Sequence, residues 1–286
     1  MKIKIGDLTV NRLGFGAMRV LGPDVWGEPK DRAGALRTFR RAVELGVNFF
    51  DTAESYGPQT DETLIAEALH PYPKGFVIAT KCGLVRPRPS RWDSDARPEK
   101  LRRDLEGSLK RLKLERIDLY QLHAPDAKVP FAESVGALSD FQKQGKVRHV
   151  GLSNVTVKQL EQARKIVPIV TVQNRYSLPD RRHEETLNWC GEQGIGFMPW
   201  YPMAGGKMLK PDHPLSQTLA KIAARHAATP AQLSLAWLLH RSPVMLPIPG
   251  TSSVAHLEEN IAASELKLEA AEWAELENAA AETTPH

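Results

Sequence analysis

The chain has 286 residues, a formal net charge of +4 and 42% hydrophobic residues. Its charges are interspersed rather than clustered on one segment, which gives no case for nucleic-acid binding. The N-terminus lacks the apolar core of a signal peptide, and no apolar run approaches a membrane span. We therefore expect a cytoplasmic protein with no membrane and no nucleic-acid partner. Cys82 and Cys190 lack metal-ligand spacing, so no metal site is expected.

Strand and helix patterns alternate along the whole chain. Residues 1–10 alternate around a Gly-Asp turn and predict a small hairpin. The strands expected after it are 13–16, 47–51, 76–80, 117–122, 147–152, 169–173, 195–199 and 244–248. The expected helices are 31–45, 61–70, 97–112, 131–144, 156–165, 183–193, 215–227, 230–241, 253–263 and 269–281. Prolines near two helix starts and glycines after several helix ends support these boundaries.

This repeated order predicts the architecture. Alternating strands and helices indicate a parallel sheet, and eight repeats indicate closure into a (β/α)8 TIM barrel, here with an N-terminal β-hairpin and extra C-terminal helices. The alternative is an open doubly wound sheet, but its GxGxxG turn is missing, since residues 14–18 (GFGAM) supply only two glycines. No linker divides the chain, so residues 1–286 are expected to form one domain.

Four polar residues fall where such a barrel places its chemistry, at the C-terminal ends of strands. Asp51 ends the second strand and Tyr56 lies in the loop after it, while Lys81 and His123 end the third and fourth strands. Each has an ordinary explanation alone: a loop cap, an amphipathic surface ring, a solvated lysine, a hydrogen-bonded histidine. Their convergence on one rim favours a shared site.

The four residue types suit the protonation of an oxygen that gains negative charge. A cationic lysine beside a tyrosine lowers the pKa of the phenol, and an aspartate can pair with that lysine. A histidine across the site can donate a hydrogen bond to a substrate oxygen. Carbonyl reduction needs this together with a hydride, which only a cofactor can supply.

At this point the sequence resembles the aldo-keto reductase family over nearly its whole length. Residues 46–57 (GVNFFDTAESYG) and 107–123 (GSLKRLKLERIDLYQLH) resemble its two signatures, and residues 145–154, 172–177 and 246–260 match further blocks in order. The resemblance implies a bacterial-type NADPH-dependent reductase of a small-molecule carbonyl substrate, often monomeric. It implies that Tyr56 is the general acid in reduction and the base in oxidation, that Lys81 paired with Asp51 lowers its pKa, and that His123 orients the carbonyl.

The resemblance also implies an extended NADP(H) bound without a Rossmann turn. Ser153, Asn154 and Gln173 match positions that hydrogen-bond the nicotinamide amide. Trp200 matches the aromatic ring that stacks on the nicotinamide, and the adjacent Tyr201 is the alternative. Thr251, His256, Glu259 and Asn260 match positions around the adenosine end. The other expected cofactor residues are Gly16, Ala17, Met18, Asp51, Pro202, Met203, Ile248, Gly250 and Ser252.

Two positions depart from the family pattern. Many members carry a lysine where this chain has Gly250 and an arginine where it has His256. The nearby hydroxyl residues and a helix N-terminus can still hold an anion. NADPH therefore remains the expected cofactor, with NADH as the alternative.

The substrate pocket is expected to be shaped by the loops near 20–30, 84–97 and 202–213. Trp26 and Trp92 are candidate lining residues beside Tyr56 and His123. Six arginines between residues 86 and 103 suggest an anionic or aromatic substrate, against the alternative of a solvated loop. Two other functions stay open: a cofactor-sensing regulatory subunit with little turnover, and a Schiff-base lyase that uses Lys81.

Overall fold

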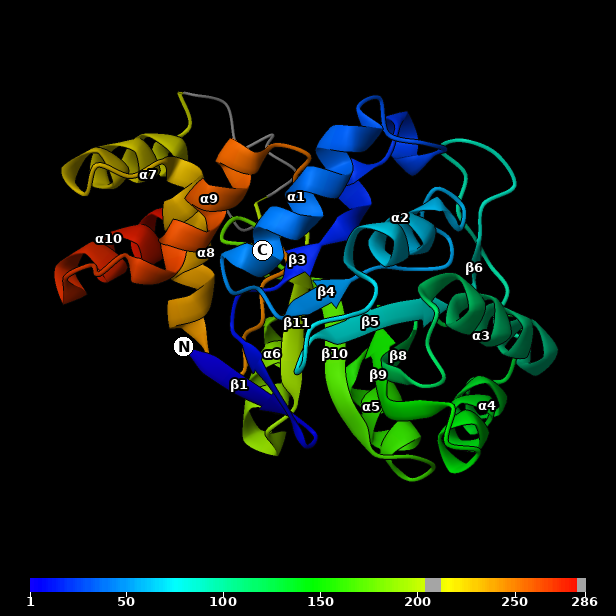
Figure 1. The fold of residues 1–286 in the computed structure, drawn as a ribbon. Helices are drawn as coiled ribbons and strands as arrows, with labels where there is room; N and C mark the ends of the chain where they lie inside the picture. The colour runs from blue at the N-terminus through cyan, green and yellow to red at the C-terminus, as the bar shows by residue number, and fades with distance from the viewer. Residues whose placement is uncertain (204–211, 282–286) are drawn as a thin grey trace.

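A curled parallel sheet forms the centre of the molecule in the computed structural model, which describes residues 1–203 and 212–281. Its strands pair in the order β11-β10-β9-β8-β5-β4-β3, so neighbours in sequence are neighbours in space (Figure 1). Their bounds are β3 Phe15–Gly16, β4 Phe49–Asp51, β5 Val77–Cys82, β8 Ile117–Leu122, β9 Val147–Ser153, β10 Ile169–Arg175 and β11 Gly196–Trp200.

The expected eighth strand, 244–248, lacks a regular ladder but still joins the two edges of the sheet. On one side the Phe197 N–H donates to Val244 O at 2.8 Å, and Leu246 N–H donates to Phe197 O at 2.8 Å. On the other side the Gly14 N–H donates to Pro247 O at 2.9 Å. Prolines 247 and 249 have no N–H to donate, which interrupts the ladder. The predicted (β/α)8 barrel is confirmed, with an irregular eighth segment.

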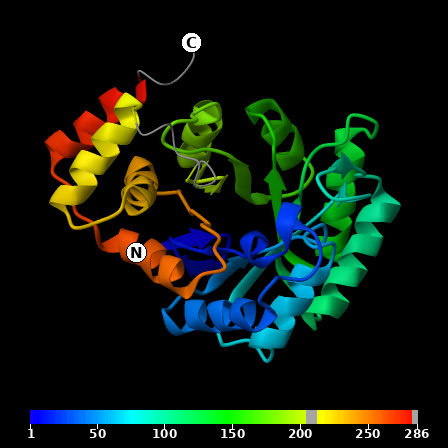
Figure 2. The ribbon, with the colours of Figure 1, turned by 90° about the horizontal axis from the view of Figure 1, so that it is seen from above.

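The helices lie around the outside of the strands (Figure 2). Their bounds are α1 Arg32–Glu44, α2 Thr60–Leu69, α3 Pro98–Leu112, α4 Phe131–Lys143, α5 Val157–Arg164, α6 Glu184–Gln193, α7 Pro214–Arg225, α8 Pro230–Arg241, α9 Val254–Ala262 and α10 Ala270–Ala281. All lie within two residues of the expected ranges. Capping residues fix several starts: Thr156 and Thr229 each form a capping box with a glutamine three residues on.

The N-terminal hairpin closes one end of the barrel. Strands β1 (Lys2–Ile5) and β2 (Leu8–Asn11) bury alternate residues, and Ile3, Ile5, Leu8 and Val10 pack against Phe49, Val77, Leu119 and Met198 of the barrel strands. Phe49 and Val77 begin β4 and β5, so this end is the N-terminal end of the strands. Because apolar side chains of the hairpin cover the N-terminal end of the barrel, polar side chains that face into the barrel can reach solvent at the opposite end, where the strands have their C-termini.

Short elements that the sequence pattern did not predict surround that opposite end. They are η1 (Ala17–Val20), η2 (Pro23–Val25) and an antiparallel pair formed by β6 (Leu84–Val85) and β7 (Asp93–Ser94). A further short helix, η4 (Ala263–Glu265), follows α9. The expected pocket loop 202–213 lies mostly outside the described residues. Within the described ranges, no helix has both the length and the apolar character to cross a membrane.

Candidate active site

The structure brings Asp51, Tyr56, Lys81 and His123 together at the C-terminal ends of β4, β5 and β8. The Lys81 ammonium is fully buried and donates to Asp51 Oδ2 at 2.7 Å, to Thr52 O at 2.8 Å and to the Tyr56 hydroxyl at 3.2 Å. The rings of Tyr56 and His123 meet edge to face with centroids 5.7 Å apart. One buried cation therefore touches both the carboxylate and the phenol.

Two amides hold the carboxylate of Asp51 from the other side. Gln121 Nε2 and Gln173 Nε2 both donate to Asp51 Oδ1, at 3.2 Å and 2.8 Å. Gln173 was expected to bind a nicotinamide amide, and here its own amide nitrogen is directed to the aspartate. Gln121 is a site residue that the sequence analysis missed. Its position in β8, two residues before His123, was the available signal, since alternate residues share one face of a strand.

As expected, the charge of Lys81 and its hydrogen bond both act to lower the pKa of Tyr56, but they are not the largest influence on it. Burial raises the pKa of Tyr56, and the opposing attraction to Lys81 does not overcome it. Burial alone would lower the pKa of Lys81, but the attraction and hydrogen bonds from Asp51 and Tyr56 raise it overall. At neutral pH the site therefore holds a charged lysine and a protonated phenol, which is the state required of a proton donor.

His123 is a neutral, buried ring that contacts Ser55, a residue that the sequence analysis did not single out. Burial, together with repulsion from Lys81, lowers the pKa of His123 well below its ordinary value. Ser55 Oγ lies 3.3 Å from His123 Nδ1. The serine hydroxyl can donate to Nδ1 or accept from it, and in the tautomer with the proton on Nε2 the serine donates and the ring can donate one hydrogen bond of its own. Ser55 lies next to Tyr56 in the loop after β4, so one short loop carries both groups.

Two adjoining pockets open beside these residues. The first, of about 210 Å³, is lined by Tyr56 and by ten of the expected cofactor residues: Gly16, Met18, Asp51, Gln173, Trp200, Tyr201, Pro202, Met203, Ile248 and Gly250. The second, of about 570 Å³, is lined by Ser153 and Asn154 as well as Tyr56, His123 and Trp92. Ala17, the first residue of η1, is buried and lines neither of these two pockets.

The aromatic residues after β11 face both pockets. Trp200 and Tyr201 meet edge to face with centroids 6.2 Å apart, and both line the two pockets. Trp200 Nε1 donates to Asn154 Oδ1 at 3.0 Å, which fixes the indole. Tyr201 has a left-handed backbone, with φ 65°. A flat ring entering the first pocket would therefore meet an indole held in place.

The departure at Gly250 has a steric reason. A Cβ at Gly250 would collide with the carbonyl oxygen of Gly16, and a Cβ at Gly16 would collide with that of Ile248. The end of β3 and the segment after the eighth strand pass too closely for any side chain, so the lysine of other family members has no room here. Thr251, Ser252, His256, Glu259 and Asn260 lie beyond this point, in α9 and the turn before it. Among them, Thr251 and Asn260 are buried and His256 is exposed.

Comparison with known proteins assigns the chain to a family. The sequence model of the Aldo/keto reductase family matches residues 12–281. The chain belongs to the aldo/keto reductase family. It is 46% identical over 275 residues to an uncharacterized oxidoreductase of Schizosaccharomyces pombe, covering 96% of this chain and 88% of that protein. It is 42% identical over 271 residues to pyridoxine 4-dehydrogenase of Escherichia coli, covering 92% and 93%.

A solved structure of the same family supports the fold. An aldo-keto reductase of Klebsiella pneumoniae, crystallised with NADPH, superposes with a TM-score of 0.83 at 26% identity, covering 99% of this chain and 95% of that one. The resemblance drawn from the sequence motifs is confirmed. In the described part of this aldo/keto reductase, no three His, Cys, Asp or Glu side chains gather as a metal-binding group.

Behind the site, this reductase buries an additional carboxyl group. Asp61, at the start of α2, is fully buried and accepts a hydrogen bond from Thr52 Oγ1 at 2.7 Å. Its Oδ1 has no hydrogen-bond partner among the described residues. Burial raises the pKa of Asp61 to about 7, against the opposing effect of the Thr52 hydrogen bond. Thr52 links this carboxyl group to the candidate site, because its hydroxyl donates to Asp61 and its carbonyl accepts from Lys81.

We expect Asp61 to make the stability of the protein depend on pH. Between its unfolded pKa of 3.8 and its folded pKa of about 7, the folded chain holds a proton that the unfolded chain has released. The free energy of unfolding therefore falls as pH rises through this range. Asp61→Asn should reduce the fall between pH 5 and pH 8 by on the order of 2 kcal/mol.

Urea unfolding of both proteins at the two pH values measures this difference. Asp140→Asn, at an exposed position of α4, is the matched control and should leave the wild-type pH dependence unchanged. If the free energy of unfolding depended on pH equally in wild type and Asp61→Asn, Asp61 would ionise as readily in the folded chain as in the unfolded chain, and the prediction would be wrong.

Proposed function

We propose that this protein is an NADPH-dependent reductase that converts an aldehyde or ketone to an alcohol, an alcohol:NADP⁺ oxidoreductase. The observation that carries the proposal is the buried Lys81 ammonium, hydrogen-bonded at once to Asp51 and to the Tyr56 hydroxyl at the wall of two pockets. This arrangement holds a protonated phenol where an oxygen can reach it and places a positive charge where phenolate will form.

The residues divide the work of proton transfer among them. When bound, NADPH supplies the hydride to the carbonyl carbon. Tyr56 donates its phenolic proton to the carbonyl oxygen, and Lys81 stabilises the phenolate that results. His123, neutral and with its proton on Nε2, donates a hydrogen bond that orients the carbonyl oxygen. Asp51 keeps Lys81 charged, since a buried ammonium without a partner would lose its proton.

The first pocket suits a nicotinamide ring. It is bounded by Trp200 and Tyr201, and the buried Gln173 amide lies beside Asp51 in its wall. Ser153 and Asn154 lie next to it with further polar groups. We propose that Trp200 is the ring that stacks on the nicotinamide, because Asn154 fixes its orientation. The Klebsiella pneumoniae relative was crystallised with NADPH, which supports the same cofactor here.

The 2′-phosphate is proposed to lie near the N-terminus of α9. With no lysine possible at position 250, the hydroxyl groups of residues 251–253, the exposed His256 and the helix N-terminus are what remains to hold it. His256→Ala should weaken the binding of NADPH by about three- to tenfold and leave NADH nearly unchanged, because only NADPH carries the phosphate. Quenching of protein fluorescence by each cofactor measures both affinities. Equal losses for both would remove His256 from phosphate recognition.

The substrate class is tested by turnover on a panel of carbonyls. The relative from Escherichia coli is a pyridoxine 4-dehydrogenase, so pyridoxal belongs in the panel with sugars, glyoxals and aromatic aldehydes. Oxidation of NADPH by purified protein, followed at its absorbance, should rise with at least one of these carbonyls. A protein that binds NADPH and reduces none of them would instead be a cofactor-sensing regulatory subunit.

The lyase alternative meets a physical obstacle. A Schiff base requires an uncharged lysine as nucleophile, whereas the pKa of Lys81 is raised and its nitrogen is engaged in three hydrogen bonds. Borohydride treatment with a carbonyl substrate should leave Lys81 unmodified. We further propose that residues 1–286 form one domain and that the protein acts as a monomer in the cytoplasm.

A further inference from the structure

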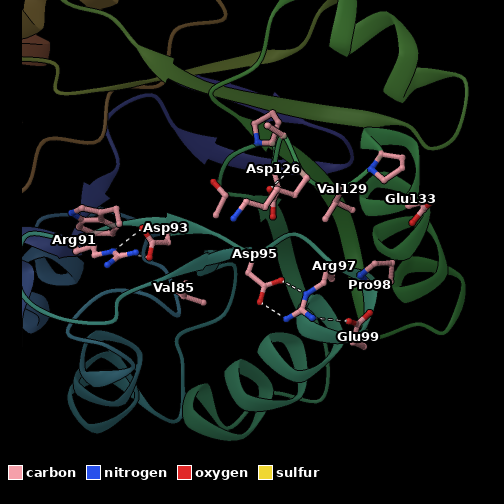
Figure 3. Close-up of a pocket in the computed structure, with 16 residues that line it drawn as sticks. Val85, Arg91, Asp93, Asp95, Arg97, Pro98, Glu99, Asp126, Val129 and Glu133 are labelled. Carbon is pink, nitrogen blue, oxygen red and sulfur yellow. Dashed lines mark hydrogen bonds and ion pairs between the residues drawn. The ribbon is translucent and has the colours of Figure 1, made fainter.

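Two arginines of the segment after β5, Arg91 and Arg97, are paired with carboxylates of the same segment. Arg91 pairs with Asp93 at 2.9 Å, and Arg97 pairs with Asp95 at 2.8 Å and with Glu99 at 3.6 Å. Figure 3 shows these pairs in the wall of a surface pocket of about 1040 Å³, with each guanidinium turned to a carboxylate. Arg91 and Arg97 are therefore already neutralised by carboxylates and are poor candidates for binding an anionic substrate.

Arg86 of the same segment is used differently, since it holds backbone rather than carboxylates. It is only 7% exposed, and its guanidinium donates to Arg91 O at 3.0 Å, to Val25 O at 3.1 Å and to Asp24 O at 2.8 Å. The same group lies 3.7 Å from the ring centroid of Trp92 and 5.5 Å from that of Trp26. The Arg86 side chain thus connects the segment that contains β6 and β7 to the loop after β3 by hydrogen bonds.

Asp24 and Val25, whose carbonyls accept from Arg86, have a strained backbone and contact the loop after β4 that carries Tyr56. Asp24 and Val25 both have left-handed backbones, with φ 57° and 58°, a conformation that costs on the order of 1–3 kcal/mol for each such residue. Gly57, directly after Tyr56, donates its N–H to Val25 O at 3.3 Å and accepts from the Gly27 N–H at 2.8 Å. Arg86 therefore stabilises a conformation that borders Tyr56.

Trp92 is the ring that this arrangement places over the reacting groups. Its centroid lies 6.2 Å from that of Tyr56 and 6.3 Å from that of His123, edge to face in both cases. It lines the 570 Å³ pocket on one side and the 1040 Å³ surface pocket on the other. The indole is 38% exposed, which is unusual for so large an apolar group and fits a wall that is completed by a ligand.

We propose that Arg86 is a positioning residue that holds Trp92 at the pocket mouth, and that Trp92 thereby selects flat ring carbonyls over small aliphatic ones. This inference rests on the proposed reductase function. An aromatic carbonyl that reaches Tyr56 and His123 can lie against the Trp92 indole, and aromatic pairs gain about 0.5–1.5 kcal/mol beyond the area they bury. A short aliphatic aldehyde gains little from the indole, so its reduction does not depend on where the ring is held.

The test compares benzaldehyde and butanal as substrates of the whole protein with NADPH. Arg86→Met keeps the length of the side chain and removes its donors, and Trp92→Ala removes the ring. Each should lower kcat/KM for benzaldehyde by about three- to tenfold, mainly through a higher KM, and change that for butanal by less than about twofold. Arg86→Lys should not restore the wild-type kinetics with benzaldehyde, because an ammonium group cannot reproduce the planar set of donors with which Arg86 reaches three carbonyl oxygens. Arg88→Met, at an exposed neighbouring position, is the matched control and should behave as wild type.

Four results would go against this inference. Equal losses for both aldehydes in Arg86→Met would indicate a general structural role, and unchanged kinetics would show that no positioning occurs. If Arg86→Met does not fold, Trp92→Ala still decides, because unchanged discrimination between the aldehydes in that variant contradicts a selective role of the ring. Failure of the wild type to oxidise NADPH with benzaldehyde would overturn this inference, whereas failure with every carbonyl of the panel would overturn the proposed function as well.

Discussion

Tyr56→Phe should lower kcat for carbonyl reduction by about 10²–10⁴-fold, the range that general acid catalysis contributes. The substitution removes only the hydroxyl, which accepts a hydrogen bond from Lys81 at 3.2 Å and carries the proton to be transferred. The ring remains, and with it the edge contacts to His123 and Trp92. We therefore expect the variant to fold and to bind NADPH with nearly unchanged affinity. Steady-state kinetics and fluorescence titration on the same preparation separate the two effects.

Tyr72→Phe is the matched control for this substitution. The Tyr72 hydroxyl also makes one hydrogen bond, to Leu112 O at 2.8 Å, but Tyr72 lies in the loop between α2 and the N-terminal end of β5, away from the strand C-termini. Its loss should leave kcat within about twofold, as expected of a position away from the reacting groups. If Tyr56→Phe and wild type oxidised NADPH at the same rate, Tyr56 would not be the acid, and the proposed mechanism would have to be abandoned.

The periodic parts of the chain could be predicted because they follow local rules. Helix boundaries depend on caps, prolines and glycines within a few residues of each end, and these agree with the structure. The rim position of Asp51, Lys81 and His123 follows from the strand order alone, since parallel strands end on one side of a barrel. Residues 244–248 are the exception. They run beside the neighbouring strands as predicted, but Pro247 and Pro249 have no N–H to donate, so no regular ladder forms.

The properties that depend on long-range packing could not be read in this way. The sequence shows an acid at position 61 but not that α2 buries it. The Lys81–Tyr56 contact was expected, yet the sign of the Tyr56 pKa shift depends on how far burial outweighs it. Similarly, a cluster of arginines looks like an anion site until each partner is known. Arg86 differs from Arg91 and Arg97 only through the distant residues that fold against it.

Breaking the buried ion pair should be the most destabilising single change in the site. Asp51→Asn replaces the carboxylate that pairs with the fully buried Lys81 by a neutral amide, so the Lys81 nitrogen must either stay charged among neutral partners or lose its proton. Removing one partner of such a pair typically costs 3–5 kcal/mol, so the free energy of unfolding should fall by about that amount at pH 7. Urea unfolding at pH 7 measures it, with activity followed in parallel.

The double variant Asp51→Asn/Lys81→Met then tests why the pair is present. With both charges gone, most of the lost stability should return, so the two single costs should exceed the double cost by about 2 kcal/mol or more. Asp140 and Lys143, an exposed pair 3.7 Å apart on α4, provide the control cycle, with an expected coupling below about 1 kcal/mol. Additive costs at Asp51 and Lys81 would contradict the buried pairing. A stable double variant without activity would instead show that the buried charge serves the chemistry of Tyr56 rather than the fold.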